Sequence, residues 1–348
     1  MHDGKGIGPF GLPAAMKASR LSLALESANP SLPETGNIAV YGAGADDDLR
    51  ALPKERCEII QGFKPDYDAL VARGFKVAVA ASGPYAVAVV KLARSKVKTR
   101  NMLAEAVAKT PKGLIIVDGM KTDGADGFYK ECGKRVEVSA AFSKAHGKLF
   151  WFSSKPAFDD WADKGQIQLE GGFQTVAGVF SADKIDRGSQ ALVDALPAKL
   201  PKRMADLGSG WGYLSRHVLA HEKVRELHLI EADYAALECA RLNVVDDRAR
   251  FHWADATRYI PDQPFDGIVS NPPFHRSRKA DPDIGCSFIH AAAAMLKPAG
   301  QMWLVANRHL PYERTLKGAF RNVEEIAGDN AFKVLRASKP MRDTRTSR

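Results

Sequence analysis

Short runs of β-branched and other apolar residues alternate with longer mixed stretches in the first half of the chain. Each run has the length of one buried strand, and residues 98–109 between two such runs have the pattern of a helix. Strands that alternate with helices form βαβ units and a largely parallel sheet. The pattern therefore predicts an α/β domain whose strands are residues 38–41, 76–79, 86–90, 114–117 and 147–153.

The same alternation begins again after a polar, glycine-containing segment at residues 155–172. Helices are expected at 234–244 and 287–296. The last two apolar runs, separated by Gly-Asp-Asn, are expected to form an antiparallel hairpin. The pattern predicts a second α/β domain, and the shared rhythm suggests an ancient duplication. Its strands are expected at residues 204–207, 227–230, 249–252, 267–270, 302–305, 323–326 and 332–335.

The domain boundaries follow from these patterns and from the length of 348 residues, which suits two ordinary domains. The first thirty residues are rich in Gly, Pro, Ser and Ala, and Met16 is an alternative start. The last ten residues are basic. We expect a mobile N-terminal segment, a first domain, a linker, a second domain and a disordered tail at residues 1–30, 31–155, 156–175, 176–338 and 339–348.

Composition excludes several classes of protein. No run of eighteen apolar residues is present, and the N-terminus does not have the pattern of a signal peptide, so a cytoplasmic protein without a membrane span is expected. The four cysteines form no CxxC pair, which argues against a zinc site or a disulfide scaffold. A net charge of +9 fits a polyanionic partner such as nucleic acid, although many basic proteins bind none.

A glycine-rich turn in the second half follows a predicted strand and precedes a helix. It reads Asp206-Leu207-Gly208-Ser209-Gly210-Trp211-Gly212. At the carboxyl end of the first strand of a doubly wound sheet, such a turn lets a ligand approach the backbone closely. Taken alone, it is also consistent with a tight turn that binds nothing. We assign Asp206, Gly208, Gly210 and Gly212 as candidate cofactor-binding residues.

Two further acidic residues follow the next two strands. Glu231 lies 25 positions after Asp206, where a carboxylate can accept hydrogen bonds from two ribose hydroxyls, with Asp233 as a nearby alternative. Asp255, after the third strand, can accept a bond from an adenine amino group. Acids at strand ends often merely cap the next helix. Because all three turns lie at one edge of one sheet, they predict a nucleoside cofactor.

The sequence Asn271-Pro272-Pro273-Phe274 follows the fourth strand. An exocyclic amine on a purine is a poor nucleophile because its lone pair is delocalised into the ring. The Asn271 side-chain carbonyl and the Pro272 main-chain carbonyl can accept its two hydrogens and so orient the lone pair. Phe274 offers a face on which a flipped base can stack. We assign Asn271, Pro272 and Phe274 as candidate catalytic residues, and Asn271 also as a candidate cofactor-binding residue.

The glycine-rich turn and the Asn-Pro-Pro-Phe-His sequence resemble those of class I methyltransferases that act on amino groups. The motifs at 178–181, 186–189 and 305–312 resemble, more narrowly, the bacterial ribosomal-RNA guanine-N2 methyltransferases of the RsmC and RlmG type. The resemblance is specific over about residues 172–338. It implies S-adenosylmethionine as cofactor, with contacts from Asp206, Gly208, Glu231 and Asp255, and substrate contacts from Asn271 and Phe274.

The family has two tandem Rossmann-like methyltransferase domains, of which the N-terminal one has lost cofactor binding. The first half of this chain fits that pattern. Its turn at 42–44 reads Gly-Ala-Gly without a third glycine, and Ser-Gly-Pro-Tyr at 82–85 lacks the amide side chain and precedes a strand. The expected fold is therefore α/β, with two doubly wound, mainly parallel, seven-stranded-type sheets, the first domain being degenerate and serving to dock the substrate.

The residues after Phe274 depart from the family pattern. A short acidic or glycine-containing step is expected after His275, whereas this chain has Arg276-Ser277-Arg278-Lys279. Their positive charge can meet RNA phosphate, although a solvated charged stretch is an equally good interpretation. We assign His275, Arg276 and Arg278, together with Phe274, as candidate substrate-binding residues.

The sequence thus predicts a monomer, without metal, that transfers a methyl group from S-adenosylmethionine to a guanine N2 amine in ribosomal RNA, with the small subunit favoured. The Asn-Pro-Pro-Phe sequence alone does not separate guanine N2 from adenine N6 or a protein glutamine amide. A different class of function is a non-catalytic RNA-binding or ribosome-assembly protein on a methyltransferase scaffold. The intact residues Asp206, Gly210 and Asn271 argue against that alternative.

Overall fold

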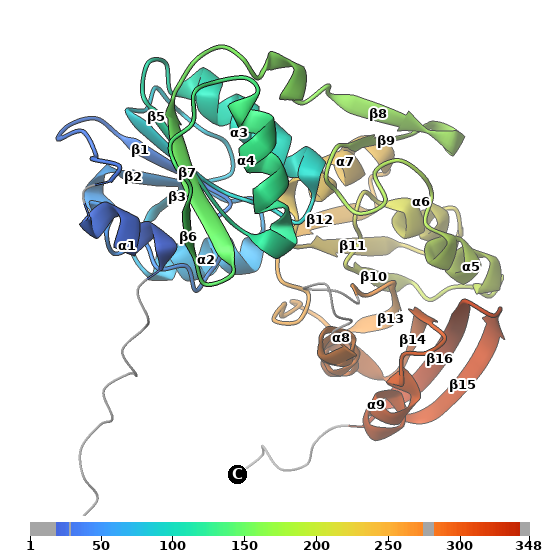
Figure 1. The fold of residues 1–348 in the computed structure, drawn as a ribbon. Helices are drawn as coiled ribbons and strands as arrows, with labels where there is room; N and C mark the ends of the chain where they lie inside the picture. The colour runs from blue at the N-terminus through green and yellow to red at the C-terminus, as the bar shows by residue number, and fades with distance from the viewer. Residues whose placement is uncertain (1–18, 28, 274–281, 342–348) are drawn as a thin grey trace, which may run out of the picture.

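A computed structural model of the chain describes residues 19–27, 29–273 and 282–341. These residues form two α/β domains, each built on a seven-stranded sheet, and the domains lie side by side (Figure 1). No helix among the described residues is long and apolar enough to cross a membrane. In the same residues, no group of three or more His, Cys, Asp and Glu side chains is placed to hold a metal ion.

The first sheet has the strand order β3-β2-β1-β4-β5-β7-β6, in which β7 alone runs antiparallel to the other six strands. Its strands are β1 (Ile38–Tyr41), β2 (Cys57–Ile60), β3 (Lys76–Ala78), β4 (Val87–Lys91), β5 (Leu114–Met120), β6 (Phe142–Lys144) and β7 (Gly147–Ser153). Apolar residues on both faces are buried. The helices of this domain are α1 (Arg20–Glu26), α2 (Lys64–Ala72), α3 (Lys96–Lys109) and α4 (Ala125–Gly133).

The second sheet repeats this order as β12-β11-β10-β13-β14-β16-β15, again with one strand, β16, antiparallel to the other six. Its strands are β10 (Arg203–Leu207), β11 (Glu226–Glu231), β12 (Ala249–Trp253), β13 (Phe265–Ser270), β14 (Leu296–Asn307), β15 (Phe320–Gly328) and β16 (Phe332–Pro340). Both faces again carry a buried apolar core. The helices here are α5 (Arg187–Ala195), α6 (Tyr213–Leu219), α7 (Tyr234–Asn243), α8 (Pro282–Met295) and α9 (Tyr312–Ala319). The predicted fold class is confirmed.

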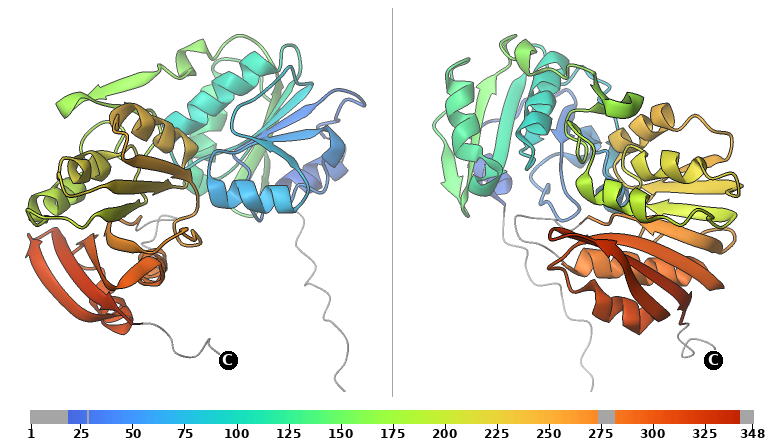
Figure 2. Two further views of the ribbon diagram at one scale, coloured as in Figure 1. Left: turned by 180° about the vertical axis from the view of Figure 1, so that it is seen from behind. Right: turned by 90° about the vertical axis from the view of Figure 1, so that its right-hand side faces the viewer.

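Between the two domains along the chain, where the sequence predicts a linker, β8 (Gln166–Leu169) and β9 (Phe173–Val176) form a hairpin that lies over α7 of the second domain (Figure 2). The preceding residues Phe158 and Trp161 are buried in the core of the first domain. Phe173 is buried in the core of the second domain. The predicted linker at 156–175 is therefore mostly folded, because its few aromatic residues are divided between the two cores.

Both predicted ends of the folded chain need correction. Within residues 1–30, expected to be mobile, α1 is held by Leu21 and Ala24, which are fully buried, and by the Ser19 hydroxyl, which caps its first turn. At the other end, β16 continues to Pro340 because that residue pairs with Phe320 of β15. The first residues of the tail predicted at 339–348 are therefore part of β16, and residues 342–348 lie outside the described residues.

Candidate active site

The glycine-rich turn lies between β10 and α6 and is fixed by the neighbouring strand, since the Gly208 N–H donates to the Ile230 carbonyl at 2.9 Å. Gly208 has φ +72°, and a Cβ there would lie 3.2 Å from the Phe288 ring. Gly212 has φ +89° at the start of α6, and a Cβ there would lie 2.8 Å from Val244. Left-handed backbone and close neighbours together require glycine at both positions.

The Glu231 carboxylate joins two of the strand-end loops. It accepts the Gly210 N–H on Oε2 and the Asp233 N–H on Oε1, each at 2.8 Å. Burial raises the pKa of this carboxyl to about 7. Asp233, the alternative ribose ligand, caps α7 by accepting the Ala235 N–H on Oδ1. Each oxygen of Glu231 can accept a second hydrogen bond, so its position remains suited to a ribose.

Asp255 follows β12 and has a local role as well. Its Oδ1 accepts the Thr257 N–H at 2.8 Å and the Thr257 hydroxyl at 2.6 Å. These two bonds hold the loop after β12 in a turn. The residue lines the same cavity as Glu231. The structure thus brings together the acidic side chains that the sequence predicts to face a nucleoside.

A cavity of about 270 Å³ lies at this edge of the second sheet. Backbone and polar groups of the predicted cofactor site line one side of it, and apolar side chains line the other. Of the predicted site residues described, Gly208, Gly210, Glu231, Asp255, Asn271 and Pro272 all line this cavity.

Two predicted cofactor residues do not line the cavity. Asp206 is completely buried beneath the glycine-rich turn, where its Oδ2 accepts the Ser215 hydroxyl at 2.6 Å. Burial, with a further contribution from the charge of Glu231, raises the pKa of Asp206 to about 7. Gly212 lies at the helix start against Val244. In this structure both residues shape the turn from below, and a direct ligand contact by either stays a prediction.

Asn271 is oriented by the chain itself. Its Nδ2 donates to Asp186 Oδ2 and to Ser189 Oγ, both at 2.9 Å. A carboxylate can only accept hydrogen bonds, so the amide nitrogen must face Asp186 and the carbonyl oxygen Oδ1 must point the other way. Asp186 is fixed in turn as the cap of α5, where its Oδ2 accepts the Ser189 N–H at 2.8 Å. Asn271 is therefore held with one defined end available to accept hydrogens.

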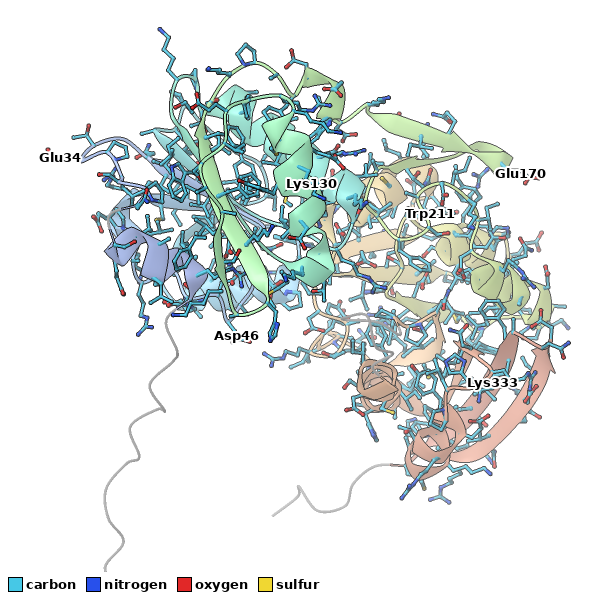
Figure 3. The ribbon with its side chains drawn as sticks, in the orientation of Figure 1. Glu34, Asp46, Lys130, Glu170, Trp211 and Lys333 are labelled. Carbon is cyan, nitrogen blue, oxygen red and sulfur yellow. The ribbon has the colours of Figure 1, made fainter. Side chains whose placement is uncertain are left out.

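Several site residues were not assigned by sequence reasoning. Asp186 and Ser189 belong to a motif that the family resemblance uses, and Asp is a preferred residue at the first position before a helix. Phe180 lines the cavity although 57% of it is exposed. Trp211 (Figure 3) positions it, donating from Nε1 to the Phe180 carbonyl at 2.9 Å. Four predicted substrate residues, Phe274, His275, Arg276 and Arg278, lie outside the described residues.

The first domain carries a different set of residues at the corresponding positions. Strand register pairs Tyr41 with Ile60 and Val90, and it pairs Leu207 with Ile230 and Ser270. The next residue along each strand identifies the counterparts. Gly42 corresponds to Gly208, Gln61 to Glu231 and Lys91 to Asn271.

At these positions the first domain lacks the hydrogen-bond acceptors that the second domain offers to a cofactor and a substrate amine. The Gln61 amide donates to the Ala43 carbonyl at 2.7 Å and cannot supply a charged acceptor. Lys91 holds its ammonium against Asp118 at 2.7 Å and Asp47 at 3.0 Å, where the second domain has the neutral Asn271. An ammonium can only donate hydrogen bonds, so Lys91 cannot accept the hydrogens of a substrate amine as Asn271 can. The geometry agrees with the prediction that this domain is degenerate.

Comparisons with known proteins agree with this geometry. Residues 170–336, which run from just before β9 through the second sheet into β16, match the family model described as Methyltransferase small domain. The chain is 28% identical over 235 residues to the ribosomal RNA small subunit methyltransferase C of Shewanella amazonensis, covering 64% of this chain and 68% of that protein. It is 35% identical over 168 residues to the ribosomal RNA large subunit methyltransferase G of Streptomyces coelicolor, covering 47% and 45%.

One solved structure is similar over nearly the whole chain. It is a 16S rRNA N2 methyltransferase (RsmC) from T. thermophilus in complex with AdoMet and guanosine. The TM-score is 0.75 at 22% identity, and the match covers 93% of each chain. At this identity the similarity shows the fold, including the arrangement of two domains.

The donors and acceptors of the cavity fit S-adenosylmethionine, since Glu231 and Asp255 can accept hydroxyl and amino hydrogens beside an apolar wall. The match to the family model covers the site residues of the second domain, from the cap of α5 to Asn271. The second domain therefore matches the methyltransferase small domain model over its predicted site, and the chain is an S-adenosylmethionine-dependent methyltransferase.

Proposed function

We propose that this enzyme methylates the exocyclic N2 amine of a guanine in ribosomal RNA, and that its substrate is the 16S RNA of the small subunit. The observation that carries the proposal is the fixed orientation of Asn271 beside the cavity, because it suits a planar amino group. The names of the relatives support RNA as the acceptor, and a small-subunit methyltransferase is similar over more of this chain than the large-subunit one. The basic net charge of +9 is consistent with RNA.

The residues of the chain act on the amine in a defined way. Asn271 Oδ1 and the Pro272 carbonyl accept its two hydrogens, which directs the nitrogen lone pair out of the plane of the base. Positive charge that develops on the nitrogen is stabilised by the same two oxygens. When bound, S-adenosylmethionine supplies an electrophilic methyl group. The methylated nitrogen then loses one proton, and since this proton is acidic, solvent can take it without a dedicated base.

The test is a transfer assay with labelled S-adenosylmethionine. Undermethylated small subunits, large subunits and the two naked ribosomal RNAs are incubated separately, and the RNA is digested to nucleosides. We expect label in N2-methylguanosine from small-subunit material. Label in large-subunit material would reassign the substrate, and label in N6-methyladenosine or in protein would contradict the proposed acceptor. A catalytically inert protein that still binds RNA would favour the scaffold alternative.

A further inference from the structure

The loop that follows β2 in the first domain is bonded to the cofactor side of the second domain. The Lys64 N–H donates to the Ala232 carbonyl at 2.8 Å, and the Tyr234 N–H donates to the Gly62 carbonyl at 2.9 Å. Phe63 and Asp233 form an antiparallel bridge between these bonds. The bridge begins two residues after Glu231, so it attaches the first domain directly to the loop that carries this carboxylate.

The two loops of the bridge are counterparts of one another. Gln61 and Glu231 occupy corresponding positions, so Phe63 corresponds to Asp233. Each loop donates one backbone N–H to the other and accepts one in return. The duplicated domains therefore contact each other here through equivalent residues, as the subunits of a symmetric dimer do.

Aromatic contacts hold the bridge in place. The Tyr67 ring lies edge-on to the Trp253 ring, with centroids 4.9 Å apart, and the Lys64 ammonium lies 4.9 Å from the centre of the Trp253 ring. The Trp253 Nε1 donates to the same Ala232 carbonyl that accepts the Lys64 N–H. The two backbone hydrogen bonds and the Trp253 contacts together hold the loop of the first domain against the second, so the bridge does not depend on the Tyr67 ring alone.

Two side chains of this loop reach the cavity of the second domain. Phe63 and Pro65 line it together with Glu231, Asp233 and Asp255. Phe63 is only half-buried in the two-domain structure, so part of its ring remains available for contact. The acidic residues beside it are those expected to bind the ribose and the adenine amino group. An apolar ring at this position matches the flat, apolar surface of an adenine base.

We propose that the degenerate first domain completes the cofactor site, with Phe63 and Pro65 forming the wall that contacts the adenosine end. This rests on the assignment of the methyltransferase site but not on the identity of the RNA target. The cofactor site is then built from both domains. The first domain no longer binds a cofactor of its own, but it contributes side chains to the cofactor site of the second domain. Its binding residues lie in a sequence region that the family model does not cover.

The experiment measures binding by the full chain in the absence of RNA. S-adenosylhomocysteine and adenosine are titrated calorimetrically into wild-type protein and into Phe63→Ala, Phe63→Leu and Tyr67→Ala variants. Tyr67 is the matched control, since it packs in the same contact between domains but does not line the cavity. Phe63→Leu keeps an apolar side chain and guards against a variant that fails to fold.

We expect Phe63→Ala to weaken both ligands by roughly tenfold, the scale of one lost base–aromatic contact, and Phe63→Leu to weaken them by about threefold. Tyr67→Ala should bind within about twofold of wild type. Equal weakening by Tyr67→Ala would show that Phe63 acts only through the domain contact and would overturn the proposal. Unchanged binding by both Phe63 variants, or weakening for S-adenosylhomocysteine but not for adenosine, would also overturn it. A wrong RNA target would leave all of these binding results intact.

Discussion

The amide nitrogen of Asn271 lies 2.9 Å from Oδ2 of Asp186, the residue that caps α5. This contact links a helix cap to the residue proposed to orient the substrate amine. The Asp186 carboxylate is held by the backbone of α5, because it accepts the Ser189 N–H. It therefore holds the Asn271 amide in a fixed position as well. Asp186 is a positioning residue in this account, since its carboxylate sets which end of the Asn271 amide faces the cavity.

Replacing Asp186 with Asn should slow methyl transfer without loosening the cap. Asn caps helices as well as Asp does, so the stability of α5 should be retained. An amide at position 186 can pair with Asn271 in either orientation, so a fraction of the protein would present Nδ2 to the substrate. We expect kcat to fall by roughly tenfold to a hundredfold with KM for RNA and S-adenosylhomocysteine affinity nearly unchanged. Steady-state kinetics and calorimetry measure these quantities.

The matched control for this variant is Asp194→Asn, at the far end of the same helix, where the carboxylate accepts a hydrogen bond from Gln190. It should leave kcat at the wild-type value. The positioning role would be refuted if the two variants behaved alike, or if Asp186→Asn raised KM with no change in kcat.

Removing the amide itself should have a larger effect. Asn271→Ala deletes one of the two acceptors proposed for the substrate amine, and transfer should fall by roughly 10² or more, the scale of one positioned polar contact. Binding of S-adenosylhomocysteine should stay within a few-fold of wild type, because Glu231 and Asp255 remain. Single-turnover transfer rates, measured beside calorimetric affinities, separate the two effects. A variant that transfers methyl groups at the wild-type rate would remove Asn271 from the mechanism.

Local sequence spacing was sufficient to predict the second domain and the parts of the site that lie at its strand ends. Each of its strands is an apolar run next to a turn, and the predicted hairpin forms β15 and β16. In the first domain β2 was missed because Glu58 interrupts its short apolar run. That side chain is nevertheless buried, since it is paired with Lys76 at 2.8 Å and accepts the Ser82 hydroxyl. Tertiary pairing overrode the local pattern.

Contacts between distant parts of the chain were not predictable in this way. Asp186 and Asn271 both belong to motifs, yet nothing in either motif indicates that one orients the other. Phe63 has no sequence signal, because its role depends on how the two domains meet. The burial of Asp206 was equally unpredictable: its side chain lies below the turn in this structure, and its contact with a ligand stays a prediction.

The degenerate first domain leads to a prediction about stoichiometry. Calorimetric titration of the full chain with S-adenosylhomocysteine should give one site, because Lys91 and Gln61 stand where Asn271 and Glu231 stand in the second domain. Glu231→Gln should weaken this single site by roughly tenfold, since hydrogen bonds to a charged acceptor contribute about 1.5–3 kcal/mol. Two sites per chain, or a site that is insensitive to Glu231→Gln, would contradict the assignment of the domains.

The buried carboxyl of Asp206 should make folding stability depend on pH. Its pKa is raised to about 7 in the folded protein by burial and, secondarily, by Glu231, whereas an aspartate in an unfolded chain has a pKa of about 3.9. Between about pH 3.9 and about 7 the carboxyl is protonated in the folded state but ionised in the unfolded state. The free energy of unfolding that this proton contributes is therefore present at low pH and is lost as the pH rises through about 7. Relative to Asp206→Asn, wild type should therefore lose stability between about pH 5 and pH 8, by an amount on the order of 2 kcal/mol or more.

Urea unfolding of both proteins across this range measures the difference. Asp262→Asn serves as the control, because the Gln263 main-chain N–H holds the pKa of Asp262 below its usual range. That carboxyl is ionised in both folded and unfolded states above about pH 5, so its variant should differ from wild type by a constant amount. The free energies of unfolding of wild type and Asp206→Asn could instead differ by the same amount at every pH from about 5 to about 8. That result would mean that the Asp206 carboxyl is ionised over the whole range, which would contradict the prediction. Saturating S-adenosylmethionine should reduce the pH dependence, since its sulfonium charge favours ionised carboxylates nearby.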